Sequence, residues 1–350
     1  MKPFGERLRA GLLLSGLLML SPTLWAEEGE ETGNARDALQ QKESDVSQEQ
    51  NLEEVFEASQ RQYSLLQSGM MSLDFSSSYS FFRDNRIDIN IEDSGITRFL
   101  IENDAQHSFG ADLSFDYGIW DNLTFNTRLP VVFKFDTEKD VSQASLGDVS
   151  FSLRYQPFPV QAGAANTTLF ATLSTATGDS PFDIDTRTQV SSGKGFYSLG
   201  GGVSMSKVID PVVLFGSLGF THSFNATGLN QRRGQRNLRR VEPGDSVNFS
   251  FGMAYSLSYE VSLSASYQQS YNLETTFIFD DERDENGDLV GASARSSDST
   301  SSVVNMSLGL RTAANRVVNF SFGFGLTEDS PDVLIGFNIP IDMSGFKPGA

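Results

Sequence analysis

Three features of the sequence predict an all-β fold, a transmembrane antiparallel β-barrel of about twelve strands behind an N-terminal helical segment. First, twelve segments between residues 69 and 341 alternate apolar and polar side chains. Second, the connections between these segments are mostly short and long in turn. Third, beyond the first 26 residues no apolar run approaches the roughly 20 residues that a membrane-spanning helix needs.

The composition excludes several classes of protein. The 350 residues include no cysteine, which rules out a disulfide scaffold and a cysteine-based metal site. Two histidines leave little for an imidazole-rich metal site or a His-based catalytic triad. A net charge of -19 argues against a nucleic-acid partner, because phosphate contacts need clustered Lys and Arg. We therefore expect a protein that is not an enzyme, with no catalytic residues, no cofactor and no metal site.

The first 26 residues have the pattern of a secretory signal peptide. Basic residues precede the short apolar run Leu12–Leu20, and the small Ala26 stands before Glu27. The run is too short to serve as a stable membrane anchor, so cleavage after Ala26 is the better interpretation. The mature chain is then exported.

Residues 27–68 form an acidic segment rich in Glu, Gln, Ala and Ser. Leu52, Phe56, Tyr63 and Leu66 follow spacings of four and three, which predicts one apolar stripe on a helix of about four turns. Such a stripe needs a partner surface. Two hypotheses stay open: a linker helix that rests on the rim of the following domain, or a plug or oligomerising stalk. Residues before Leu52 support a coiled coil only weakly.

The twelve alternating segments occupy residues 69–341 and give each strand one apolar face and one small polar face. Most are as long as the roughly 9–11 residues that cross a bilayer at a tilt. In order they are Leu73–Phe81, Phe109–Tyr117, Leu123–Phe133, Val149–Tyr155, Leu169–Leu173, Tyr197–Met205, Val212–Phe224, Val247–Leu257, Val261–Tyr271, Val304–Leu310, Val318–Leu326 and Val333–Ile341.

The lengths of the connections favour a membrane barrel over a secreted sandwich of two antiparallel sheets. The long connections are expected at Asn85–Ala105, Asp136–Ser145, Thr177–Lys194, Asn225–Asp245 and Glu274–Thr300. Outer-membrane barrels have short periplasmic turns and long outer loops, and an even strand count leaves both termini in the periplasm. Because lipid offers no partner for an open strand edge, the sheet must close. Residues 342–350 remain as a C-terminal tail.

The polar face predicts a narrow water-filled lumen, because its side chains are mostly Ser, Gly, Asn and Thr. Alternation also points seven charged side chains inward, which we expect to line the pore: Asp74, Asp112, Asp116, Arg128, Lys134, Arg154 and Arg311. Charges of both signs in a lumen can form cross-pore ladders or set an ion preference. Structural pairing along the wall is an equally good interpretation.

Turn and strand-entry motifs carry a resemblance to known barrels. They include Asp121-Asn122-Leu123-Thr124, Leu146-Gly147-Asp148-Val149, and Thr177-Gly178-Asp179-Ser180-Pro181 followed by Gly193-Lys194-Gly195. Over residues 69–341 the chain resembles the proteobacterial outer-membrane transporter-like barrels grouped with the MetA-type phenol-degradation pathway proteins. Within that group it is similar to the functional-amyloid (Fap) secretion channels of pseudomonads. That resemblance implies a homotrimer of twelve-stranded barrels with a helical plug, here Leu52–Leu66.

Taken together, these features predict a passive channel that moves a specific cargo across the bacterial outer membrane, in contact with its lipids and lipopolysaccharide. The resemblance implies as cargo either an amyloid subunit that is secreted or a small hydrophobic or aromatic molecule that is taken up. A structural or adhesive barrel without transport is the third hypothesis.

Overall fold

A computed structural model describes residues 65–92, 95–136, 141–161, 163–184, 189–233, 236–280, 282–283, 289–290, 293–313 and 316–341. Within these ranges the chain forms strands and turns and no helix. None of the described residues belongs to a helix of the length and apolarity needed to cross a membrane. The expected signal peptide, the acidic segment up to residue 64 with Leu52, Phe56 and Tyr63, and the tail over residues 342–350 lie outside the described residues.

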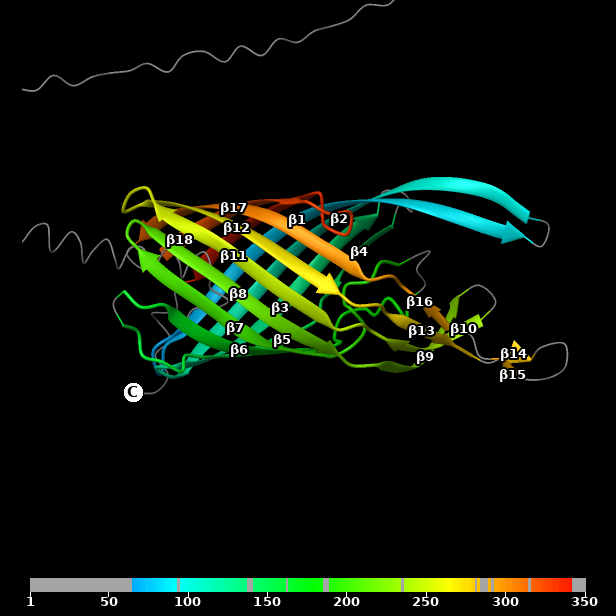
Figure 1. Cartoon of the computed structure of the whole chain (residues 1–350), viewed down its shortest axis with the longest axis horizontal. Coiled ribbons are helices and arrows are strands. Elements are labelled where there is room, and N and C mark those ends of the chain that lie inside the picture. The colour runs from blue at the N-terminus through cyan, green and yellow to red at the C-terminus, as the bar shows by residue number, and fades with distance from the viewer. Residues whose placement is uncertain are drawn as a thin grey trace, which may run out of the picture. The chain divides into compact units, whose positions relative to one another are not determined.

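A single antiparallel sheet closes into a barrel, which confirms the predicted fold class (Figure 1). β4 and β5 lie end to end beside β3, so the thirteen strands of this sheet make a wall twelve strands around. The strands are β1 (Met71–Glu92), β2 (Gly95–Trp120), β3 (Leu123–Asp136), β4 (Val141–Leu146), β5 (Ser150–Tyr155), β6 (Asn166–Ser174), β7 (Ser198–Ile209), β8 (Val212–Ser223), β11 (Ser246–Ser256), β12 (Val261–Asn272), β17 (Ser299–Ala313), β18 (Arg316–Gly325) and β19 (Val333–Ile341).

The register puts the two faces of every strand in separate environments. One row around the wall pairs Phe251 with Tyr267 and Val304 with Phe324, and the next row pairs Gly252 with Ser266. The Phe251 side chain is 58% exposed although the backbone of β11 is paired with a strand on each side. Apolar side chains exposed in this way cover the outer face of the barrel strands. An apolar surface of this extent is unfavourable in water and suits a barrel whose outer face meets lipid.

The prediction of a long loop over Asn85–Ala105 is wrong. β1 and β2 stay paired from Asp84 and Asp104 to Glu92 and Gly95, so the chain turns back at the tip of a long hairpin. The backbone of a hairpin forms its own hydrogen bonds, so the pair can continue without an extended apolar face. Ile87, Ile89 and Ile91 alternate with polar residues, a weak signal of this extension in the sequence.

The prediction of a loop over Asp136–Ser145 is also partly wrong, because Val141–Leu146 forms β4 beside the second half of β3. The wall is then interrupted at Gly147-Asp148-Val149. There the connection between β6 and β7 supplies the missing partners: Thr177 Oγ1 donates to Gly147 O at 3.0 Å and accepts from Val149 N at 2.9 Å. A side chain thus satisfies backbone groups that a neighbouring strand would otherwise pair.

Asp148 holds this connection against the interruption. Its two carboxylate oxygens accept the N–H groups of Gly178 at 3.0 Å and Lys194 at 2.7 Å. A Cβ on Gly193 would overlap the Asp148 carboxylate and the backbone of Gly178, so only glycine allows this approach. We call these four residues the Asp148 latch. The two motifs around Asp148 and Gly178–Gly193 are therefore parts of one contact.

Replacing Asp148 with Asn should loosen the connection between β6 and β7. The substitution removes the charge that strengthens two hydrogen bonds to backbone N–H groups, and we expect it to lower the unfolding free energy by about 1–3 kcal/mol. Limited proteolysis of the detergent-solubilised protein should show faster cleavage within residues 177–197. Asp183→Asn, at an exposed site in the same connection, is the control. Equal cleavage of the Asp148 variant and wild type would contradict this role.

Two further expected loops, Asn225–Asp245 and Glu274–Thr300, contain strands at the long-connection end of the barrel (Figure 1). β9 (Ala226–Arg233), β10 (Arg236–Glu242), β13 (Thr276–Phe279) and β16 (Ser293–Arg295) form a four-stranded sheet, and β14 (Glu282–Arg283) pairs with β15 (Leu289–Val290). The four-stranded sheet has its own core, in which Leu238 and Val241 are buried with Phe182. This core explains why the connections fold.

Acid should weaken the contact between β10 and the end of β13. Asn237 N donates to Asp280 Oδ1 at 2.9 Å, and this bond is the main reason that the pKa of Asp280 lies below its ordinary value. A depressed pKa stabilises the folded state above the unfolded pKa of about 4, and that contribution is lost as the pH falls through the folded pKa. The wild type should therefore unfold at a higher temperature than Asp280→Asn at pH 7, with the difference shrinking in acid. A difference independent of pH would contradict this explanation.

Candidate functional site

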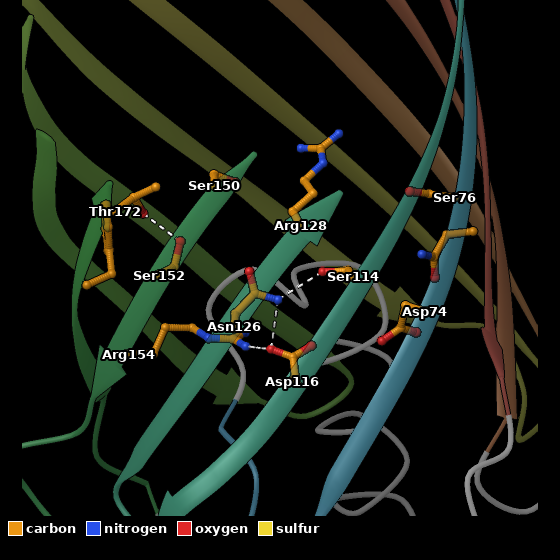
Figure 2. A pocket seen from close by; sticks show the side chains of 12 residues that line it. Asp74, Ser76, Ser114, Asp116, Asn126, Arg128, Ser150, Ser152, Arg154 and Thr172 are labelled. Carbon is orange, nitrogen blue, oxygen red and sulfur yellow. Dashed lines mark hydrogen bonds and ion pairs between the residues drawn. The ribbon is translucent and has the colours of Figure 1, made fainter. Parts of the chain in front are cut away.

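A cavity of about 350 Å³ lies inside the barrel against the strands of its first half (Figure 2). Most of the residues that line it are polar, and they combine charges of both signs with hydroxyl and amide groups and one aromatic ring. The lining residues are Asp74, Ser76, Ser114, Asp116, Asn126, Arg128, Ser150, Ser152, Arg154, Phe170, Thr172 and Asn338. A polar hollow of this size can hold water and a small solute.

An ion pair between Arg154 and Asp116 forms the buried part of this site. Arg154 extends from β5 across β3 to Asp116 on β2, as Figure 2 shows, and its side chain is only 3% exposed. Asn126 Nδ2 donates to the same Asp116 oxygen at 3.0 Å and to Ser114 Oγ at 2.9 Å. Additional hydrogen bonds of this kind are what a buried ion pair needs to offset the loss of hydration.

A second ion pair, between Arg128 and Asp112, lies closer to open water. Arg128 Nε and Nη2 donate to the two Asp112 oxygens at 3.1 and 2.7 Å. The Asp112 side chain is buried, whereas the Arg128 side chain is 55% exposed and its guanidinium points into the lumen (Figure 2). These two bonds leave Nη1 of Arg128 available to water or a solute.

The structure places the seven predicted pore-lining residues in two regions. Asp74, Asp116, Arg128 and Arg154 line the cavity, and Asp112 pairs with Arg128 beside it. Lys134 lies on the same face of β3 as Arg128, nearer the long connections. Arg311 is separate: at the short-turn rim its Nε donates to Tyr259 O at 3.2 Å, and its guanidinium carbon lies 4.6 Å from the Tyr259 ring centre.

Phe170 and Asn338 were not among the predicted residues. A Cβ on Gly202 would come 2.6 Å from the Phe170 ring, and one on Gly219 would come 3.3 Å from it, so these glycines let the ring lie against the wall. The Gly200–Gly202 run inside an alternating strand is the sequence signal for this close approach. Oδ1 of Asn338 is buried without a hydrogen-bond partner among the described residues.

The start of the described chain enters the barrel at its short-turn end. Leu66 N donates at 2.8 Å to Oγ1 of Thr124, a fully buried residue on the inner face of β3. A Cβ on Gly118 would overlap the carbonyl of Gln67, so this carbonyl lies directly on the inner face of β2. Leu66, the last residue of the predicted apolar stripe, is thus fixed through its backbone N–H to the inner wall.

No family model matches the sequence. The structure is similar to the COG4313 outer membrane channel from Pseudomonas putida F1, with a TM-score of 0.56 and 11% identity over 79% of this chain and 97% of that chain. It also matches the translocator domain of the autotransporter NalP from Neisseria meningitidis (TM-score 0.44, 8% identity, 88% and 96% covered). A third match is a deletion mutant of the monoaromatic hydrocarbon channel TodX (TM-score 0.40, 11% identity, 79% and 89% covered).

At these identities the likeness shows the fold alone, and only the first match is close enough to support an argument. The fold is a closed antiparallel barrel of the kind found in outer-membrane channels. Together with the apolar outer face and the polar cavity, it defines the class of the protein as a membrane-type β-barrel with a hydrophilic lumen.

Removing the Arg154 side chain should destabilise the barrel more than removing Arg128. Arg154→Gln leaves the carboxylate of Asp116 buried without its cation, and we expect a loss of about 3–5 kcal/mol in unfolding free energy. Arg128→Gln should cost about 1 kcal/mol, because water reaches that pair. Urea unfolding in detergent measures both. The double variant Asp116→Asn with Arg154→Gln should recover part of the loss. Equal costs for the two single variants would contradict the difference in burial.

Proposed function

We propose that the protein is a passive channel of the bacterial outer membrane that admits small polar solutes. The observation that carries this proposal is the contrast between the two faces of one closed wall. The outer face is apolar and exposed, whereas the inner face encloses a cavity lined by charged, hydroxyl and amide groups. A nonpolar surface suits lipid, and a polar cavity suits water and dissolved molecules.

The far wall of the barrel, across the lumen from the charged strands β1, β2, β3 and β5, supports an open lumen. On the inner faces of β8, β11, β12 and β17, short serine side chains pair with one another: Ser217 with Ser250 at 2.7 Å, and Ser264 with Ser307. Serine and glycine fill little of the interior of a barrel twelve strands around, which is wider than the eight-stranded barrels that side chains can fill. Water can therefore occupy the space between the serine-rich wall and the charged wall.

The proposed orientation follows the connections. The end with short turns, where Leu66 enters and β19 ends, faces the periplasm. The end with the four-stranded sheet faces outward, among the sugars and phosphates of lipopolysaccharide. This is the arrangement of short and long connections that outer-membrane barrels share.

We further propose that the segment with Leu52, Phe56, Tyr63 and Leu66 acts as a plug. The support comes from the described residues that follow it: Leu66 is held on the inner wall by Thr124.

Aromatic small molecules are a second candidate cargo. The observation in their favour is Phe170, whose ring lies against glycines and lines the cavity, where a second ring could pack on it. No feature of the described residues favours an amyloid subunit as cargo.

Single-channel conductance in planar bilayers tests both proposals. The mature protein should give small or intermittent currents, and a chain that starts at Gly69 should give larger and steadier ones, because it lacks the plug. Equal currents from the two proteins would contradict the plug. An absence of current from both, in protein shown to be folded and inserted, would contradict the channel.

A further inference from the structure

The charges on the inner wall are sorted by sign. The carboxylates Asp74, Asp112 and Asp116 lie on β1 and β2, and the cations Arg128, Lys134 and Arg154 lie on β3 and β5. We call these two groups the acidic stripe and the basic stripe. Among the inward-facing side chains that the structure describes on the other barrel strands, Arg311 at the rim is the one charge. Three negative groups therefore oppose three positive groups on one part of the wall.

The two stripes lie side by side along the barrel. β2 and β3 are paired from Gln106 and Asp136 to Trp120 and Leu123, so the boundary between the stripes follows this pair. The two ion pairs cross the boundary and hold the charges close to it. Asp112 and Asp116 are four residues apart on one strand, a separation of roughly 13 Å, so each stripe is long compared with a small solute.

Each stripe also offers groups that a solute can contact. On the basic side, the half-exposed Arg128 guanidinium presents Nη1 to the lumen. On the acidic side, the carboxylates of Asp74 and Asp116 line the cavity itself. Asn338 pairs with Ser76 on β1, whose side chain also lines the cavity.

Resting on the proposed function, we infer that the lumen selects small dipolar solutes, zwitterions of the size of a free α-amino acid. Because the six charges of the two stripes balance, the stripes themselves favour neither cations nor anions. The electric field, however, runs across the wall from the basic stripe to the acidic stripe. A zwitterion can turn its carboxylate to one stripe and its ammonium group to the other, whereas a singly charged ion is repelled by one of them. A neutral polyol of the same size gains no such attraction.

Liposome swelling compares a zwitterion with a polyol of similar size. Proteoliposomes with the mature protein should admit L-threonine faster than erythritol, by about threefold or more if two solvated charge contacts each contribute modestly. In a KCl gradient the reversal potential should stay near zero, because the stripes balance. Equal entry of the two solutes, or a strong preference for one ion sign, would overturn the inference.

Variants of the exposed pair separate charge from structure. Arg128→Gln should shift the reversal potential toward cation selectivity, and Asp112→Asn should shift it toward anion selectivity. The double variant D112N with R128Q should keep a potential near zero yet lose the advantage of L-threonine. Arg128→Lys, which keeps the charge, should retain it, and Ser307→Ala on the far wall is the control. An advantage that persists in the double variant would overturn the inference.

The same experiment distinguishes this inference from the proposed function. Ionic current without any preference for L-threonine would leave the channel intact and overturn the zwitterion selectivity alone. If inserted wild-type protein passed neither ions nor either solute, the channel and the inference would both be overturned.

Discussion

The need to pair every backbone group in a closed wall is the constraint on which the rest of this structure depends. Lipid cannot hydrogen-bond an exposed strand edge, so the first and last strands must meet, and here β1 pairs with β19 from Leu73 and Ile341 to Phe81 and Val333. The interruption at Gly147–Val149 obeys the same constraint. Thr177 and the backbone of the β6–β7 connection take the place of strand partners, and the Asp148 latch holds that connection in position.

Closure also determines what each side chain can do. Once the register is fixed, a residue faces either the outer apolar surface or the lumen, and its neighbour in sequence faces the opposite way. Asp112 on β2 therefore shares the inner face with Arg128 on β3, and Asp116 shares it with Arg154 on β5, close enough to form ion pairs. The glycines of β7 and β8 leave space on this face for Phe170, and Gly118 leaves space for the entering chain.

The period of two was sufficient to predict the barrel and the inward direction of its charges, because both are properties of single strands. Ion pairing depends on the register between strands, so the sequence indicated inward charges without identifying Arg154 as the partner of Asp116. The β1–β2 extension is not predicted because the polar run Arg83-Asp84-Asn85-Arg86 interrupts the apolar alternation before it resumes at Ile87. The four-stranded sheet depends on Phe182 packing with Leu238, and the latch on Asp148 contacting Lys194, residues far apart in the sequence.

The central claim is that water fills the inside of this wall and lipid covers the outside. Because the native chain has no cysteine, single cysteines at neighbouring positions of β12 can test it in reconstituted membranes. Ser266 faces the lumen and Ala265 faces outward. A membrane-impermeant, water-soluble thiol reagent should modify Ser266→Cys rapidly and Ala265→Cys hardly at all. Equal modification of the two, or faster modification of Ala265→Cys, would contradict the account.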